Sequence, residues 1–174
     1  MEKFNSVLDF INQYEEKYAG PMCVVFTLED VLAQYHSSLN IESICSVVPR
    51  ARHLLTHLQA RGIKCILTSN TDKKSTLKVL CETELYKYFN RDEDIFYISG
   101  ESRDEYMNIL AENGFDPESS IAVVSNTVGF EAVSAAKMIP LCFTGAPAAV
   151  VAEFSKTLSE CYLTTLQTDK LVEY

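Results

Sequence analysis

Short apolar runs alternate with longer segments of helical periodicity along most of this 174-residue chain. A short apolar run that contains β-branched residues and is bounded by turn residues is typical of a strand buried on both faces. The runs expected to form strands are 22–26, 63–67, 95–98, 121–124 and 141–143, with a last short strand near 162–163. Strands that alternate with helices form mainly parallel sheets. The sequence therefore predicts an α/β fold, a doubly wound, three-layer Rossmann-like fold with a mainly parallel sheet.

The segments between these strands carry apolar residues at helical spacing. Helices are expected at 49–61, 72–81, 104–112, 130–136 and 148–154, with a helical tail from 169. Residues 1–19 predict an amphipathic helix that packs on the same domain, and residues 30–48 predict a loop with some helix. Because no linker, repeat or low-complexity segment interrupts the pattern, we expect residues 1–174 to form a single domain.

The charge and the cysteines restrict the setting in which the chain acts. The net charge is −9, which disfavours nucleic acid and anionic membrane surfaces as partners. No apolar run reaches the ~20 residues of a membrane span, and the first residues lack the apolar region of a secretion signal. The six cysteines include no C-x-x-C pair. Cys23, Cys65 and Cys142 lie in apolar runs, so we expect buried thiols in a reducing, cytoplasmic protein.

The chemistry of a doubly wound sheet is expected at the carboxyl ends of its strands. Four segments follow the predicted strands and carry polar side chains: 27–30, 68–70, 99–103 and 125–127. Hydroxyl and amide groups in such segments could bind an anion, or they could simply cap the helix that follows.

Three of these segments resemble motifs of the haloacid dehalogenase (HAD) superfamily. The run 24–32, VVFTLEDVL, is similar to the first motif, a hydrophobic strand followed by F-D-x-D-G-T-L. Thr68 follows a hydrophobic strand, as does the Ser or Thr of the second motif. The run NGFDPESSIAVV and the later GFEAVSAAKM resemble the surroundings of the fourth motif. The order and spacing agree over residues 22–166, although the single motifs are degenerate.

The resemblance implies a phosphatase mechanism whose main residues have been replaced. In the family the first Asp is the nucleophile, the second Asp is the acid/base, Mg²⁺ is bound between the first and fourth motifs, and a cation of the third motif neutralises phosphate. Thr27 stands at the nucleophile position and Glu29 at the acid/base position. Asn126 stands at a metal-ligand position, and the cation position falls near Gly100, with Arg103 the nearby cation.

These replacements predict a catalytically degenerate protein, a pseudo-phosphatase that acts by binding. A threonine needs a base to become a nucleophile, and the neutral Asn126 is a poor substitute for an anionic Mg²⁺ ligand. The alternative is a divergent phosphoric monoester hydrolase that is Mg²⁺-dependent and uses Glu29 and Asp30 for the metal. Thr27 with Glu29 as base is chemically conceivable, whereas Asp30 as nucleophile is disfavoured because Leu32 stands at its +2 position. A third reading is a different Rossmann-like module.

The expected ligand is a protein, a second copy of the chain, or a phosphate-like anion, and no cofactor is expected unless Mg²⁺ supports an activity. The candidate binding residues are Thr27, Glu29, Asp30, Thr68, Ser69, Asn70, Arg103 and Asn126. Residues 31–48 leave room for a flap and not for a helical cap domain, so a capless site is expected to be open. His53 and His57 share one helix face, and we interpret them as solvated because no third metal ligand is evident.

Overall fold

The computed structural model describes residues 23–38, 41–47, 51–90, 93–143 and 162–164. Its main sheet has six strands in the order β5-β4-β1-β6-β7-β8, and every neighbouring pair is parallel. The strands are β1 (Cys23–Thr27), β4 (Lys64–Ser69), β5 (Ile95–Tyr97), β6 (Ser120–Val124), β7 (Ile139–Phe143) and β8 (Tyr162–Thr164). The predicted doubly wound parallel α/β fold is confirmed.

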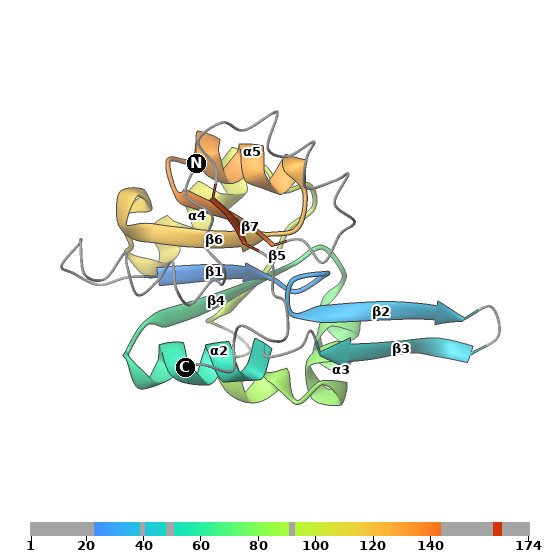
Figure 1. The fold of residues 1–174 in the computed structure, drawn as a ribbon. Helices are drawn as coiled ribbons and strands as arrows, with labels where there is room; N and C mark the ends of the chain where they lie inside the picture. Colours follow the sequence, from blue (N-terminus) through green and yellow to red (C-terminus); the bar gives the residue numbers. More distant parts are fainter. Residues whose placement is uncertain (1–22, 39–40, 48–50, 91–92, 144–161, 165–174) are drawn as a thin grey trace.

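The helices lie on both faces of this sheet and make the fold three-layered (Figure 1). The helical elements are α2 (Ala51–Ala60), α3 (Lys73–Glu82), η1 (Leu85–Tyr88), α4 (Arg103–Asn113), η2 (Pro117–Ser119) and α5 (Thr127–Ala135). The predicted helices at 1–19, at 148–154 and from 169 lie outside the described residues.

Alternating side chains of the fully buried β1 join two separate cores. Val24 and Phe26 belong to the cluster that contains the apolar faces of α2 and α3. Cys23 and Val25 belong to the second cluster, with α4 and α5. Because successive side chains of a strand point to opposite faces, a fully apolar strand must be covered on both sides.

Residues 30–48 differ from the sequence prediction of a loop with some helix. They contain an antiparallel hairpin, β2 (Ala33–Ser38) and β3 (Ile41–Val47), which projects beyond the main sheet (Figure 1). The two strands of this hairpin pair with each other and not with the main sheet, and their sequence shows no clear alternation. Such a segment is easily mistaken for a loop.

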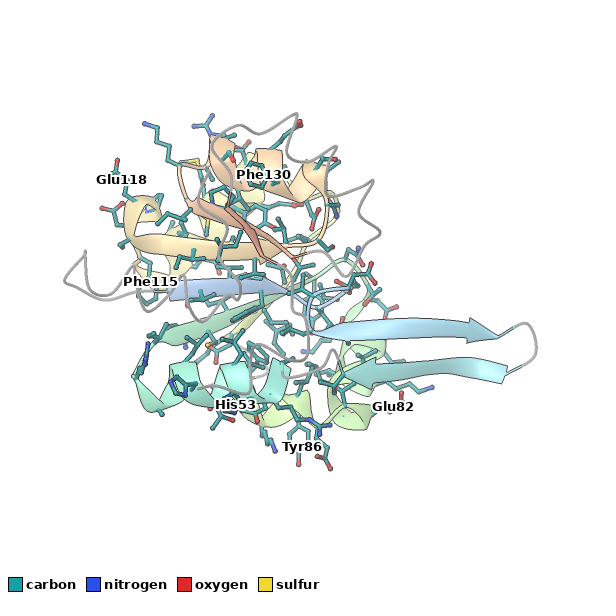
Figure 2. The ribbon with its side chains drawn as sticks, viewed as in Figure 1. His53, Glu82, Tyr86, Phe115, Glu118 and Phe130 are labelled. Carbon is teal, nitrogen blue, oxygen red and sulfur yellow. The ribbon has the colours of Figure 1, made fainter. Side chains whose placement is uncertain are left out.

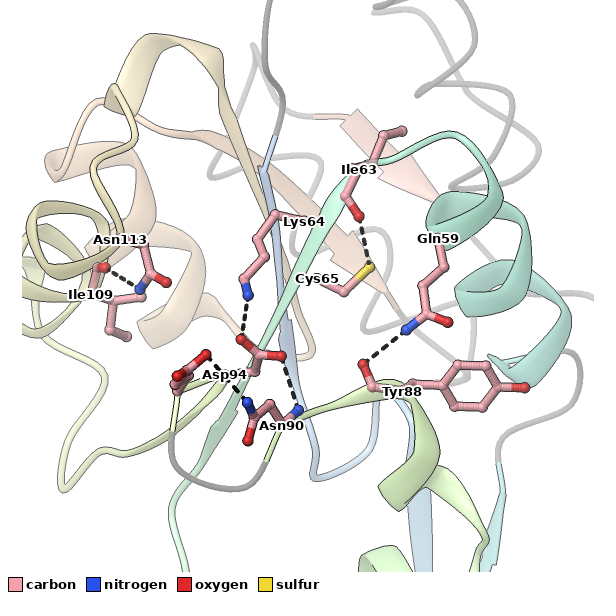
Figure 3. Close-up of polar contacts among 10 residues, drawn as sticks. Gln59, Ile63, Lys64, Cys65, Tyr88, Asn90, Asp94, Ile109 and Asn113 are labelled. Atoms are coloured by element: carbon pink, nitrogen blue, oxygen red, sulfur yellow. Dashed lines mark hydrogen bonds and ion pairs between the residues drawn. The ribbon is translucent and has the colours of Figure 1, made fainter.

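An ion pair stabilises the start of β5, at the edge of the sheet. Lys64 Nζ lies 2.5 Å from Asp94 Oδ1, and the backbone N–H of Asn90 donates to Asp94 Oδ2 over 2.9 Å (Figure 3). Asp94 is buried. A buried carboxylate is tolerated where it is paired and hydrogen-bonded, as this one is.

Two structural expectations for single residues can be judged directly. Cys23 and Cys65 are buried free thiols, and burial raises the pKa of each to about 12, as expected for inert core cysteines. Gly62 has φ 72° and follows α2 in the left-handed conformation that glycine commonly adopts after a helix. Among the described residues, no helix is long and apolar enough to cross a bilayer.

Candidate functional site

The candidate site lies where the order of strands reverses, at the carboxyl ends of β1, β4 and β6. From β1 the chain adds β4 and β5 on one side and then β6, β7 and β8 on the other. In doubly wound sheets the connections leave this edge in opposite directions at such a point, and ligands usually bind there. Thr27 ends β1, Ser69 ends β4, and Asn126 stands between β6 and α5.

A tight turn after β1 brings Glu29 toward β4. The backbone N–H groups of Leu32 and Ala33 both donate to the carbonyl of Leu28, over 3.1 and 3.0 Å. Asp30 takes φ 61°, in the left-handed region where the resembling motif has glycine. Aspartate tolerates this conformation better than most residues do, and its side chain is exposed here.

Glu29 is hydrogen-bonded to the end of β4 and to the first residue of the segment that leads into α3. Only 9% of Glu29 is exposed. Its Oε1 accepts a hydrogen bond from Ser69 Oγ over 2.7 Å, and its Oε2 accepts one from the backbone N–H of Asn70 over 3.4 Å. Ser69 Oγ in turn lies 2.8 Å from Thr76 Oγ1 and 3.1 Å from Thr71 Oγ1. The first hydroxyl and amide donors after β4 are therefore already bound to a carboxylate of this chain.

Thr27 and Thr68 lie side by side, because they are paired across β1 and β4. Thr68 is fully buried, and its Oγ1 donates to the carbonyl of Phe26 over 3.4 Å. The hydroxyl of buried Tyr106, from α4, lies near both threonine hydroxyls without a well-formed hydrogen bond to either. Thr27 Oγ1 and Tyr106 Oη have no hydrogen-bond partner among the described residues. The three hydroxyls form a buried floor, which we call the hydroxyl floor (Thr27, Thr68 and Tyr106).

Burial is the main reason why the pKa of Tyr106 is raised above its usual range, and the charge of Glu101 raises it further. Interactions with the Thr27 and Thr68 hydroxyls work in the opposite direction. Tyr106 is therefore a neutral phenol at physiological pH.

Glu101 belongs to the site, although the sequence alone did not single it out. It has φ 49° and lies against the first turn of α5, since a methyl group built on Gly129 would come within 2.9 Å of Glu101 Oε2. Burial raises the pKa of Glu101, as do the charges of Glu29 and Glu105, while the side chain of Asn126 acts against this. Glu29 and Glu101 are thus close enough to influence each other.

The remaining predicted residues have more peripheral places. Asn126 Oδ1 accepts the backbone N–H of Gly129 over 2.8 Å and so caps α5. Arg103 is exposed at the first position of α4, and no ion pair joins it to Glu29 or Glu101 within the described part of the chain. Asn70 is exposed and contributes its backbone amide to the site.

His53 and His57 lie on α2, away from these strand ends, with ring centroids 6.0 Å apart. Figure 2 shows His53 on α2, where it is exposed.

Comparisons with known proteins agree with this geometry. No family profile and no curated protein sequence matches the chain. Several solved structures do match the chain. A conserved haloacid dehalogenase-like protein of unknown function from Agrobacterium tumefaciens superposes on it with a TM-score of 0.69 at 13% identity, over 88% of this chain and 97% of that one. The chain has the HAD-like fold. The family resemblance seen in the sequence is confirmed at the level of the fold.

Two further structures carry ligands. A HAD family hydrolase from Deinococcus radiodurans, with bound phosphate and sodium, superposes with a TM-score of 0.66 at 15% identity, over 86% of this chain and 92% of that one. CbbY from Rhodobacter sphaeroides, in complex with phosphate, gives a TM-score of 0.58 at 11% identity, over 71% of this chain and 86% of that one.

The positions that the HAD resemblance singles out can now be compared with the geometry. The nucleophile position holds Thr27, whose hydroxyl belongs to the hydroxyl floor. The residue next to Gly100, where a phosphate-neutralising cation is expected, is Glu101. The sequence could have indicated Glu101 only through its place directly after Gly100. It was missed because a cation was expected near that position, and Glu101 is an acid.

The residues present do not fit the Mg²⁺ site that the HAD resemblance implies. Thr27 offers a neutral hydroxyl in place of a carboxylate, and Asn126 Oδ1 is used by the Gly129 amide. Both oxygens of Glu29 already accept hydrogen bonds. No group of three or more His, Cys, Asp or Glu residues in the described ranges is arranged to hold a metal ion. Mg²⁺ requires a near-octahedral set of oxygen ligands, which these residues do not supply.

Proposed function

We propose that this protein is a pseudo-phosphatase, a HAD-fold protein without phosphoryl-transfer activity that acts by binding another protein. The observation that carries the proposal is the carboxylate of Glu29, bound to Ser69 Oγ and to the Asn70 amide. Donors at the start of a helical segment are the groups that would otherwise bind a phosphate. Here an acid of the same chain holds them.

The absence of an activated nucleophile supports the same proposal. Thr27 Oγ1 would need a base within hydrogen-bond reach, and among the described residues none is bonded to it. Its neighbour Tyr106 stays protonated at neutral pH, because burial raises its pKa. Glu29, the alternative base, accepts its hydrogen bonds from Ser69 and Asn70.

The charge of the site disfavours a phosphate-like anion as the ligand. A phosphate placed at the carboxyl ends of β1 and β4 would meet both Glu29 and Glu101. Like charges repel more strongly where solvent is partly excluded, and both acids are largely buried or half-buried. A protein partner, including a second copy of this chain, fits the charge better than an anion does.

Phosphoester hydrolysis assays test the proposal. The purified chain is incubated with p-nitrophenyl phosphate and a panel of phosphomonoesters, with Mg²⁺ and with EDTA, and we expect no turnover above background in either condition. The competing function is a Mg²⁺-dependent phosphatase that uses Glu29 and Asp30 for the metal. Metal-dependent turnover that Glu29→Gln abolishes and Glu131→Gln retains would establish that function and overturn ours. Glu131 is the matched control because it is exposed on α5.

Thermal unfolding gives a second readout. A ligand that binds only the folded state raises the melting temperature. We expect no rise with inorganic phosphate, with or without Mg²⁺. A rise in melting temperature with phosphate concentration would contradict the proposal, since it would show that the donors at the strand ends still bind phosphate.

A further inference from the structure

A cavity lies at the other edge of the sheet, where the parallel strands begin. Its volume of about 540 Å³ is in the range of small-ligand pockets. Its walls come from the start of β4, from β5 and the segment before it, and from the end of α4 with the turn that follows. The lining residues are Lys64, Glu93, Phe96, Glu112, Asn113 and Phe115. Figure 2 shows Phe115 at this end of the sheet.

Two phenylalanines form the apolar part of the cavity. Phe96 and Phe115 pack against the core cluster that contains α4 and α5, and both are half-buried. Because both also line the cavity, part of each side chain is turned toward it. Such surfaces suit a flat group, and the face of an aromatic ring attracts positive charge.

The charged side chains make the cavity negative. The Lys64 ammonium lies 2.5 Å from Oδ1 of the buried Asp94, so these two charges offset each other (Figure 3). Glu93 and Glu112 are exposed, which places their carboxylates where the cavity opens to solvent. One oxygen of Glu93 accepts a hydrogen bond from Asn90 Nδ2 over 3.2 Å. The two acids therefore give the opening a net negative charge.

The end of α4 adds to this negative potential. The last carbonyl groups of a helix carry partial negative charge, and basic side chains are favoured beside them. The first turn of α4 follows the corresponding rule, since it carries Asp104 and Glu105. The last turn carries no basic residue, and Glu112 stands there instead. A cation in the cavity would supply the positive charge that this end of the helix lacks.

A guanidinium fits this combination better than an ammonium or an anion does. It is planar and weakly hydrated, it stacks on aromatic faces, and its N–H groups bind carboxylates in pairs. An ammonium is a strongly hydrated point charge, which loses more by leaving water for the phenylalanine rings. An anion that approached Lys64 would meet the carboxylates of Glu93 and Glu112.

We propose that this cavity binds the arginine side chain of a protein partner, with its guanidinium against the phenylalanines and its N–H groups on the acids at the opening. The net charge of −9 favours a basic partner at long range as well. The proposal goes beyond the function proposed above, because the cavity shares no residue with the strand-end site. The two can therefore fail separately.

The probe for this proposal is the pentapeptide acetyl-Gly-Gly-Arg-Gly-Gly-amide, titrated into the ¹⁵N-labelled full chain. We expect saturable shifts of the amides of Phe96, Gly114 and Phe115, with a Kd of about 1 mM for a ligand held by one side chain. The same peptide with citrulline, which keeps the shape of arginine without its charge, should produce none. The peptide with lysine should bind about fivefold more weakly.

Variants connect the binding to the lining of the cavity. Glu112→Gln removes a charged partner, and Phe115→Leu removes an aromatic face while keeping an apolar side chain against the core. Each should weaken binding by about fivefold. Glu131→Gln removes a charge from exposed α5, outside the cavity, and should leave the Kd within about twofold. Folding of each variant is checked from its amide spectrum, and the citrulline comparison needs no variant.

Four outcomes would overturn the inference: no saturable shift, equal binding of the citrulline peptide, equal binding of the lysine peptide, or unchanged affinity in both variants. Tighter binding of butylguanidinium than of the pentapeptide would assign the cavity to a small molecule and overturn the protein partner. Saturable shifts of the same amides with inorganic phosphate would assign it to an anion at Lys64 and would overturn the inference too. Phosphatase turnover refutes only the function proposed for the strand-end site.

Discussion

Thr27→Val tests whether the residue at the nucleophile position is a buried hydroxyl without a partner. Thr27 is 4% exposed, and its Oγ1 makes no hydrogen bond with the described residues. An unpaired buried hydroxyl costs about 1–3 kcal/mol, and valine keeps the volume while favouring the strand. We expect the free energy of unfolding to rise by about 1–2 kcal/mol.

The matched control is the same substitution at a threonine whose hydroxyl is satisfied. Thr76 is fully buried, and its Oγ1 lies 2.8 Å from Ser69 Oγ and 3.0 Å from Thr71 Oγ1. Thr76→Val leaves those two hydroxyls short of a partner, and we expect a loss of about 1–2 kcal/mol. In a chain of this length the melting temperatures should move in opposite directions, each by about 2–8 °C.

Urea unfolding of the two variants, compared at equal slope, measures the difference. The reasoning is refuted if Thr27→Val destabilises the chain as much as Thr76→Val does. Thr27 Oγ1 would then have a hydrogen-bond partner, and the argument for an incomplete hydroxyl floor would fail with it.

Three further predictions follow from the geometry. The pKa of Glu101 is raised in the folded chain, so the folded state binds this proton more tightly than the unfolded state does, and the free energy of unfolding falls as the pH rises through the raised pKa. Glu101→Gln should therefore stabilise the chain at pH 7 and lose that advantage below the ordinary carboxyl pKa. Urea unfolding midpoints at several pH values measure the difference. Gly129→Ala should displace the Glu101 carboxylate, whose Oε2 would lie 2.9 Å from the new methyl group. The substitution should therefore lower the free energy of unfolding less in a Glu101→Ala background than in the parent chain. A double-mutant cycle measures this coupling. Asp94→Ala should lower the free energy of unfolding by about 2–3 kcal/mol, because it removes the partner of Lys64 Nζ and of the Asn90 amide; urea unfolding measures this. A loss below about 0.5 kcal/mol would show that the ion pair contributes little.

The sequence was sufficient for the sheet, because buried parallel strands and amphipathic helices leave local patterns. The runs around Val24, Ile66 and Val123 are apolar without interruption, and each is followed by helical spacing or by a helix cap. The hairpin of β2 and β3 was missed, since its pairing is not evident in the periodicity of residues 30–48.

The site was predicted only in part. We expected Thr27, Glu29, Ser69 and Asn126 at one edge because each lies at the end of a predicted parallel strand, and the carboxyl ends of such strands meet at one edge. The strand order itself came only from the structure. Which of two neighbouring hydroxyls faces Glu29 depends on the alternation of side chains along β4, and the structure assigns Ser69 to Glu29 and Thr68 to the floor with Tyr106.

By itself, the sequence determined the alternation of strands and helices and the presence of a threonine, Thr27, directly after the first buried strand, because both are properties of residues read in order. Only the tertiary structure decided that Glu101 approaches α5 at Gly129, that Tyr106 reaches Thr27 from α4, and that Glu29 occupies the donors after β4. These contacts join residues that are distant in the chain. Their energies depend on burial and on neighbouring charge, which are properties of the folded arrangement and not of any local pattern.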